Sequence, residues 1–211
     1  MALHKKVAWL AGVVYFIQGA LGIAGVALPL YLRSHGFSIP DIALIVSLSS
    51  APWFFKILYG AVSDAYPIGG LRRKPYLILC SVLSSLGWVL LSMAPPQAVW
   101  LVLSMSVASL GLAATDVITD GFVVDHSDSE TARVYQTISW GSRSLGAFLS
   151  GVTGGFLAAK VNPRMIFLAT SILPLFAFAE FTSIAVSASV KSMAIEPPLG
   201  KCTIRPYADS I

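Results

Sequence analysis

The chain has 211 residues, of which 56% are hydrophobic and only 11% are charged, and its formal net charge is +4. Soluble domains carry about 25% charged residues, so this composition excludes an ordinary soluble domain and indicates a protein of the lipid bilayer. The positive charge is explained by its position along the chain, described below, so we expect no nucleic-acid partner. Cys80 and Cys202 lie far apart and match no metal spacing.

Six runs of mostly apolar residues reach the length of about 20 residues that crosses about 30 Å of hydrocarbon. They predict an all-α membrane protein in which residues 1–187 form one bundle of six transmembrane helices. The first run is too long for a cleavable signal peptide, so we treat it as retained. The predicted spans are 7–32, 42–62, 75–93, 98–119, 135–159 and 165–186.

Proline, serine and glycine mark where these helices begin, bend and pack. Ser38, with Asp41 three residues later, predicts a capped start of the second span. Pro29 and Pro52 lie inside predicted spans and should kink them. The fifth span has small residues at every fourth position, which predicts a stripe of close helix packing, with clearance for a substrate as the alternative. This stripe consists of Ala147, Gly151, Gly155 and Ala159.

The distribution of cations predicts the orientation of the chain. If the six spans alternate in direction, both termini lie on the side that carries most of the cations. Because that side normally faces the cytoplasm, we expect cytoplasmic termini, in a plasma or inner membrane or in an organelle envelope. Residues 188–211 have two adjacent prolines and no long apolar run, which is typical of a cytoplasmic tail or linker. One side would carry nine cations, Lys5, Lys6, Arg72, Arg73, Lys74, Arg133, Lys191, Lys201 and Arg205, and the other side three, Arg33, Lys160 and Arg164.

Five ionisable residues fall within the predicted spans or at their inner edges. A charge near the centre of a membrane helix costs about 2.5 to 3.5 kcal/mol, so these side chains should pair with one another or line a wet cavity. Three of them lie at a similar depth, which favours pairing. The residues are Lys56, Asp116, Asp120, Arg143 and Glu180.

This set of charges has two interpretations. It could be an internal ion-pair network that holds spans two, four, five and six together. Alternatively, Lys56 and Arg143 offer positive charge to an anionic substrate. A coupling proton would then be carried by an acidic partner, for which Asp116, Asp120 and Glu180 are the candidates.

Aromatic residues accompany these charges. Trp53 and Trp140 are typical of packing or interfacial anchors, and the alternative is that one of them stacks on a planar ligand. His126 lies in an acidic connector that we interpret as solvated, so we expect no metal site there. No serine or cysteine in the sequence is accompanied by the residues that would activate it as a nucleophile, so we expect neither an enzyme nor a cofactor.

The connector between the second and third spans, "YGAVSDAYPIGGLRRKPYL", has a carboxylate at one end and three cations at the other. In one interpretation, its cations fix the orientation of the helices in the membrane. The alternative is that Asp64, Arg72 and Arg73 latch this face of the bundle and release it during alternating access.

Several motifs together resemble a known family. "GAVSDAYPIGGLRRK" resembles the loop signature of the major facilitator superfamily, in which Gly60 and Asp64 precede a basic cluster. "APWFFK", "ATDVITDGF" and "SWGSRS" then resemble the folate-biopterin transporter family within that superfamily. The matching positions are Pro52, Trp53, Lys56, Asp116, Asp120, Trp140, Gly141, Ser142 and Arg143.

The resemblance implies the N-terminal six-helix half of a major facilitator fold, acting on an anionic folate or pterin with a proton gradient. Family members carry two halves with the substrate between them, so the resemblance implies a second six-helix half, from the same or another chain. The alternative is a non-transporting assembly or scaffold subunit of the same superfamily.

Overall fold

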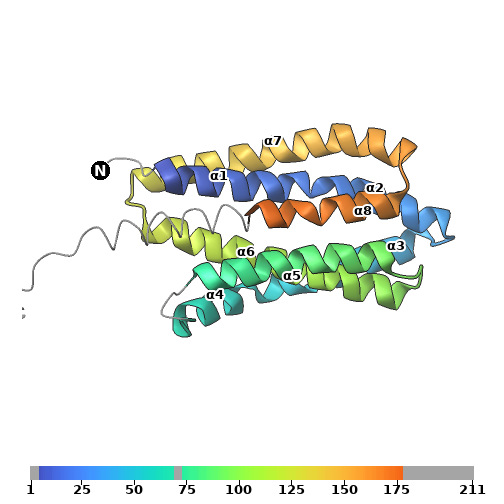
Figure 1. Cartoon of the computed structure of the whole chain (residues 1–211), viewed down its shortest axis with the longest axis horizontal. Helices are drawn as coiled ribbons and strands as arrows, with labels where there is room; N and C mark the ends of the chain where they lie inside the picture. Colours follow the sequence, from blue (N-terminus) through green and yellow to red (C-terminus); the bar gives the residue numbers. More distant parts are fainter. Residues whose placement is uncertain (1–4, 69–72, 178–211) are drawn as a thin grey trace, which may run out of the picture.

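The computed structural model describes residues 5–68 and 73–177, and within these ranges the chain forms helices and no strand. Figure 1 shows the helices running roughly along one long axis, with α1 beside α7 and α5 beside α6. The elements are α1 (Lys5–Ala20), α2 (Gly22–Ser34), α3 (Ile39–Ser49), η1 (Ala51–Phe55), α4 (Lys56–Ala65), α5 (Lys74–Met93), α6 (Ala98–Asp125), α7 (Thr131–Lys160) and α8 (Pro163–Thr170).

The first predicted span, 7–32, falls within one apolar helical run, Lys5–Ser34, that contains both α1 and α2. The interruption between the two helices lies at Leu21, whose N–H still donates to the Ile17 carbonyl at 3.0 Å. The helix assignment continues through Pro29, so α2 is not interrupted there. In a membrane helix the neighbouring groups can satisfy the carbonyl that a proline leaves free.

The second span is built from α3, the 3₁₀ segment η1 and α4. The predicted capping box is confirmed: the Ser38 N–H donates to Asp41 Oδ2 at 3.0 Å, and the Asp41 N–H donates to Ser38 Oγ at 3.3 Å. Pro52 lies in η1, where the α-helical hydrogen bonding gives way to tighter turns. This break offsets α4 from α3 immediately before Lys56.

Helices α5 and α6 pack closely along their length, because glycines let their backbones meet. A Cβ built on Gly87 would lie 2.2 Å from the Ala108 nitrogen, and one built on Gly111 would lie 2.4 Å from the Ser84 nitrogen. In a membrane, such van der Waals contacts replace the hydrophobic effect that drives helix packing in soluble proteins. Helix α6 continues to Asp125, beyond the predicted end at residue 119.

The predicted packing stripe on the fifth span was wrong by one residue. The stripe at positions 147, 151, 155 and 159 is exposed, and a Cβ on Gly151 or Gly155 would meet nothing within 4 Å. The buried row is Gly146, Ser150 and Gly154, and a Cβ on Gly146 would lie 2.3 Å from the Phe16 carbonyl. Both rows repeat every four residues, so spacing alone could not distinguish two faces about 100° apart.

By length and composition, four segments of the described ranges are long and apolar enough to cross a membrane. Helix α7 is long enough but less apolar, and the described part of the last span is the shorter apolar segment Pro163–Ala177. The predicted number of six spans is therefore not confirmed by this criterion, whereas the all-α membrane class is. Large apolar side chains are exposed along the outside, including Phe54 and Phe148, as expected for a surface that faces lipid.

Candidate functional site

A partly buried ion pair joins α4 to α6. Lys56 Nζ lies 3.3 Å from Asp116 Oδ2, and the exposed fraction of the side chain is 41% for the lysine but only 6% for the aspartate. The predicted pairing of these two residues at one depth is confirmed. Asp116 Oδ1 is buried and has no hydrogen-bond partner within the described part of the chain. The carboxylate therefore depends on Lys56 for its compensation.

Asp120, one turn after Asp116, has a different partner. The hydroxyl of Tyr15 on α1 donates a short hydrogen bond to Asp120 Oδ1. Tyr15 is buried and Asp120 is half-buried. The sequence analysis missed Tyr15, because a lone tyrosine in an apolar run resembles ordinary packing; the signal was the unpaired carboxylate on the facing helix.

Arg143 on α7 has no carboxylate partner among residues 5–68 and 73–177. Its guanidinium carbon lies 5.3 Å from the centre of the Trp140 ring, which is a cation–π contact. The prediction that span five joins an ion-pair network is therefore not seen in the described ranges.

Lys56 and Arg143 share a local arrangement. Lys56 Nζ lies 6.0 Å from the Trp53 ring centre, and in both pairs the tryptophan precedes the cation by three residues. That spacing places two side chains on one helical face. Trp53 is half-buried and Trp140 is exposed.

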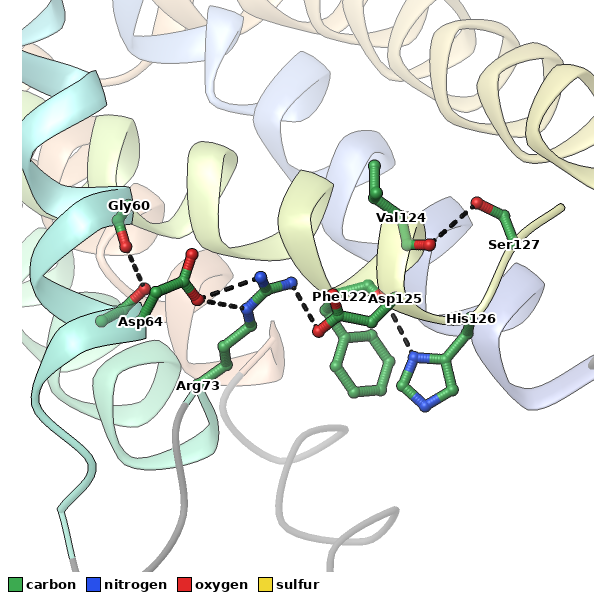
Figure 2. Close-up of polar contacts among 9 residues, drawn as sticks. Gly60, Asp64, Arg73, Phe122, Val124, Asp125, His126 and Ser127 are labelled. Carbon is green, nitrogen blue, oxygen red and sulfur yellow. Dashed lines mark hydrogen bonds and ion pairs between the residues drawn. The ribbon is translucent and has the colours of Figure 1, made fainter. Parts of the chain in front are cut away.

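A second charge cluster lies at the end of the bundle where α4 and α6 end and α5 begins (Figure 2). Arg73 is central: its Nη2 and Nε each lie 3.0 Å from Asp64 Oδ1, and its Nη1 lies 3.0 Å from Asp125 Oδ2. We call Asp64, Arg73 and Asp125 the end cluster. It joins three helix ends, and it brings together two of the candidate gating residues, Asp64 and Arg73.

The end cluster contains a residue that the sequence analysis missed. Asp125 is the last residue of α6, which continues without a break beyond Asp116 and Asp120. The predicted fourth span ended at residue 119, so Asp125 was assigned to the following connector. The guanidinium lies against α6, because a Cβ on Gly121 would lie 2.6 Å from Arg73 Nη1. Gly60 faces Val117 of α6, whose Cγ2 would lie 3.2 Å from an added Cβ.

The connector after α6 contains one carboxylate whose titration is shifted. Asp128 Oδ1 accepts from the backbone N–H of Thr131 at 2.8 Å, from its hydroxyl at 2.7 Å and from the Glu130 N–H at 3.2 Å. Because these donors favour the charged form, the pKa of Asp128 is lowered. This carboxylate caps the start of α7.

A groove of about 330 Å³ lies between α1 and α7, lined by Trp9, Gly12, Phe16 and Ser142 among others. It is largely apolar and has no cation in its lining, so it does not match an anion. It contains neither Trp53 nor Trp140. Among the described residues, no group of three or more His, Cys, Asp or Glu side chains could hold a metal ion. The candidates Arg72 and Glu180, and the tail 188–211, lie outside the described residues.

Comparisons with known proteins identify the family. The model of the BT1 family matches residues 18–203, which is most of the chain. The chain belongs to the BT1 family. The folate-biopterin transporter of Synechocystis sp. is 32% identical over 166 residues, covering 77% of this chain and 34% of that protein. The probable folate-biopterin transporter 4 of Arabidopsis thaliana is 31% identical over 173 residues, covering 79% and 35%.

Relatives in other organisms have similar names. The putative folate transporter 2 of Plasmodium berghei is 28% identical over 172 residues, covering 77% of this chain and 38% of that protein. These names are those of transporters and not of enzymes, which agrees with the absence of a catalytic motif in the sequence. The BT1-family chain spans about a third of the length of the curated relatives it matches.

Proposed function

We propose that this chain is one six-helix half of a secondary active transporter for a small anionic molecule of the folate or pterin class. The observation that carries the proposal is the pair of cation–tryptophan contacts, at Lys56 with Trp53 and at Arg143 with Trp140. A cation with an adjacent ring offers both parts of such a ligand a partner, since the ring stacks on a flat heterocycle and the cation attracts a carboxylate. The names of the family's curated relatives support the substrate class.

Arg143 is the better first contact for the anion. It has no carboxylate partner within the described ranges, whereas Lys56 already compensates Asp116. Substrate binding at Lys56 would draw it away from Asp116, and a proton on Asp116 would then replace the lost compensation. This exchange gives Asp116 a role in proton coupling that follows from its burial.

Asp120 is the second proton-coupling residue in our proposal, held by Tyr15, and Glu180 is retained as a third from its sequence position. The end cluster, with Gly60 and Arg72, would gate access at its end of the bundle. The fold would be the N-terminal half of a major facilitator protein, with a second six-helix half completing the cavity and both termini in the cytoplasm.

The test is uptake into proteoliposomes that contain this chain and the C-terminal half of the Synechocystis relative. We expect folate uptake driven by an inward proton gradient, and at least a tenfold loss with Arg143→Gln, in line with one lost charge-assisted contact of about 1.5 to 3 kcal/mol. The matched control is Lys160→Gln, because Lys160 contacts the Phe156 ring in the last turn of α7, away from the buried acids.

Two results would contradict the proposal. Equal folate uptake by the Arg143→Gln and Lys160→Gln proteins would remove Arg143 from the site. Stable assembly of the two halves without uptake under any gradient would favour the alternative, a scaffold subunit whose exposed small-residue face on α7 holds a partner.

A further inference from the structure

A small cavity with a few polar side chains in its wall lies between the helices, apart from the ion pairs and the end cluster. Its volume is about 10 Å³, and its walls come from α1, α5, α6 and the segment after α8. Most of the lining is apolar, including Val14, Leu112 and Ala177. The polar side chains that line it are Gln18, Ser81, Ser84 and Thr115.

Gln18 carries the strongest evidence for a ligand in this cavity. Its exposed fraction is 8%, and neither its Nε2 nor its Oε1 has a hydrogen-bond partner in the described part of the chain. A carboxamide offers two donors and an acceptor with two lone pairs. Leaving such groups buried and unpaired is destabilising, and in a bilayer no bulk water lies nearby to satisfy them.

The two serines on α5 show the same property. Ser81 and Ser84 are 2% and 1% exposed, and their Oγ atoms also lack a partner among the residues described. Other buried hydroxyls nearby are paired: Ser85 donates to the Ser171 carbonyl at 2.7 Å, and Thr115 donates to the Gly111 carbonyl at 2.8 Å. Three side chains with unpaired buried polar atoms, Gln18, Ser81 and Ser84, therefore line this cavity from two different helices.

We propose that this cavity is a binding site for one structural water molecule, which bridges Gln18 on α1 to Ser81 and Ser84 on α5. A cavity of about 10 Å³ is at the size limit for one water, and buried waters typically make about three hydrogen bonds to groups that otherwise lack partners. The site is too small for a folate or pterin, so the inference does not depend on the proposed transport function.

The test is a double-mutant cycle on the full chain in lipid nanodiscs, read out as the thermal midpoint of unfolding. Gln18→Leu and Ser84→Ala each remove one of the partners that hold the water. We expect each change alone to lower the midpoint by roughly 2 to 4 °C, and the double variant to lose clearly less than the sum, because both act on one water.

Ser85→Ala provides the matched control, since Ser85 is a buried serine on the same helix with its own direct acceptor. In the double variant with Gln18→Leu, the decrease of the midpoint caused by Ser85→Ala should add fully to that caused by Gln18→Leu. Two additive cycles, or a midpoint raised by Gln18→Leu, would overturn the proposal. A structure at a resolution that shows waters decides independently: density for a water within hydrogen-bond distance of Gln18 and a serine hydroxyl supports it, and a protein side chain in that place refutes it.

Discussion

The interior ion pair and the end cluster use the same chemistry in different surroundings. Asp116 in the interior has a side chain only 6% exposed, whereas Asp64 and Asp125 in the end cluster are 50% and 55% exposed. Water and salt can reach the carboxylates of the end cluster and reduce their attraction to Arg73. The Asp116 carboxylate is shielded from water and salt, and its compensation comes from Lys56, which is 41% exposed. The same type of contact is therefore a strong constraint in one place and a weak, reversible one in the other.

This difference matches the roles that we propose for the two regions. A gate must open and close, so its contacts have to be weak enough to break at little cost. A buried acid that exchanges its lysine partner for a proton needs the opposite property. The free energy of its carboxylate without a compensating charge must be high, so that the proton is taken up when the lysine leaves. Four predictions follow from this comparison, in order of decreasing expected effect.

The largest effect is expected from Lys56→Met, which leaves Asp116 buried without its cation. We expect the free energy of unfolding in mixed micelles to fall by about 3 kcal/mol, the lower end for a broken buried pair. Asp116→Asn should cost less, because Lys56 is more exposed. The double variant should recover much of the loss, and a fully additive double variant would mean that the pair does not exist in solution.

Tyr15→Phe removes the hydroxyl that donates to Asp120 and keeps the ring. We expect a loss of about 2 kcal/mol in the free energy of unfolding, since hydrogen bonds to charged groups contribute about 1.5 to 3 kcal/mol. Tyr76→Phe is the control, because its hydroxyl donates to the Tyr66 carbonyl on an exposed contact. If Tyr15→Phe and Tyr76→Phe cost the same, Asp120 does not depend on Tyr15.

Arg73→Ala breaks the end cluster and should cost about 1 kcal/mol at low ionic strength. Its cost should shrink when salt is raised from about 0.01 to 1 M, over which the screening length falls from about 30 to 3 Å. The cost of Lys56→Met should not change over that range. Equal salt dependence of the two variants would remove the distinction between the two regions.

The smallest effect concerns acid stability and Asp128. Its pKa is lowered, so its contribution to stability is present above the unfolded value of about 3.9 and is lost as the pH falls through the lower folded value. Thr131→Ala removes the hydroxyl donor and moves the folded pKa back toward the unfolded value, so the loss of stability on acidification should be smaller and complete at a higher pH. Acid titration followed by circular dichroism measures it; an unchanged profile would show that the cap does not act on this carboxylate.

The sequence was sufficient for the helices and for part of the charge pattern, because the underlying signals are local. Apolar length located the helical segments, and the capping residues Ser38 and Asp41 located a helix start. The Lys56–Asp116 pair was also predictable, since both residues lie at similar depth and unpaired charges are costly in a bilayer.

The missed contacts depend on how helices rotate and where they end. The partnership of Tyr15 with Asp120, and the face that α7 buries, require the rotation of each helix about its axis, which a repeat of four residues leaves open. Asp125 was missed because it begins a polar run, residues 125–133, that resembles a connector, yet α6 continues to that carboxylate. Helix rotation and helix ends are set by neighbours that lie far away in the sequence.

The most direct test of the account is whether water reaches the two cation–tryptophan pairs, Lys56 with Trp53 and Arg143 with Trp140. In a background with Cys80 and Cys202 replaced by serine, cysteines at positions 53 and 143 would be treated with a membrane-impermeant maleimide in vesicles that contain both halves. We predict labelling at both positions and protection by folate, with none at a control cysteine replacing the exposed Phe148. Labelling that folate leaves unchanged, or a failure to label positions 53 and 143, would contradict the account.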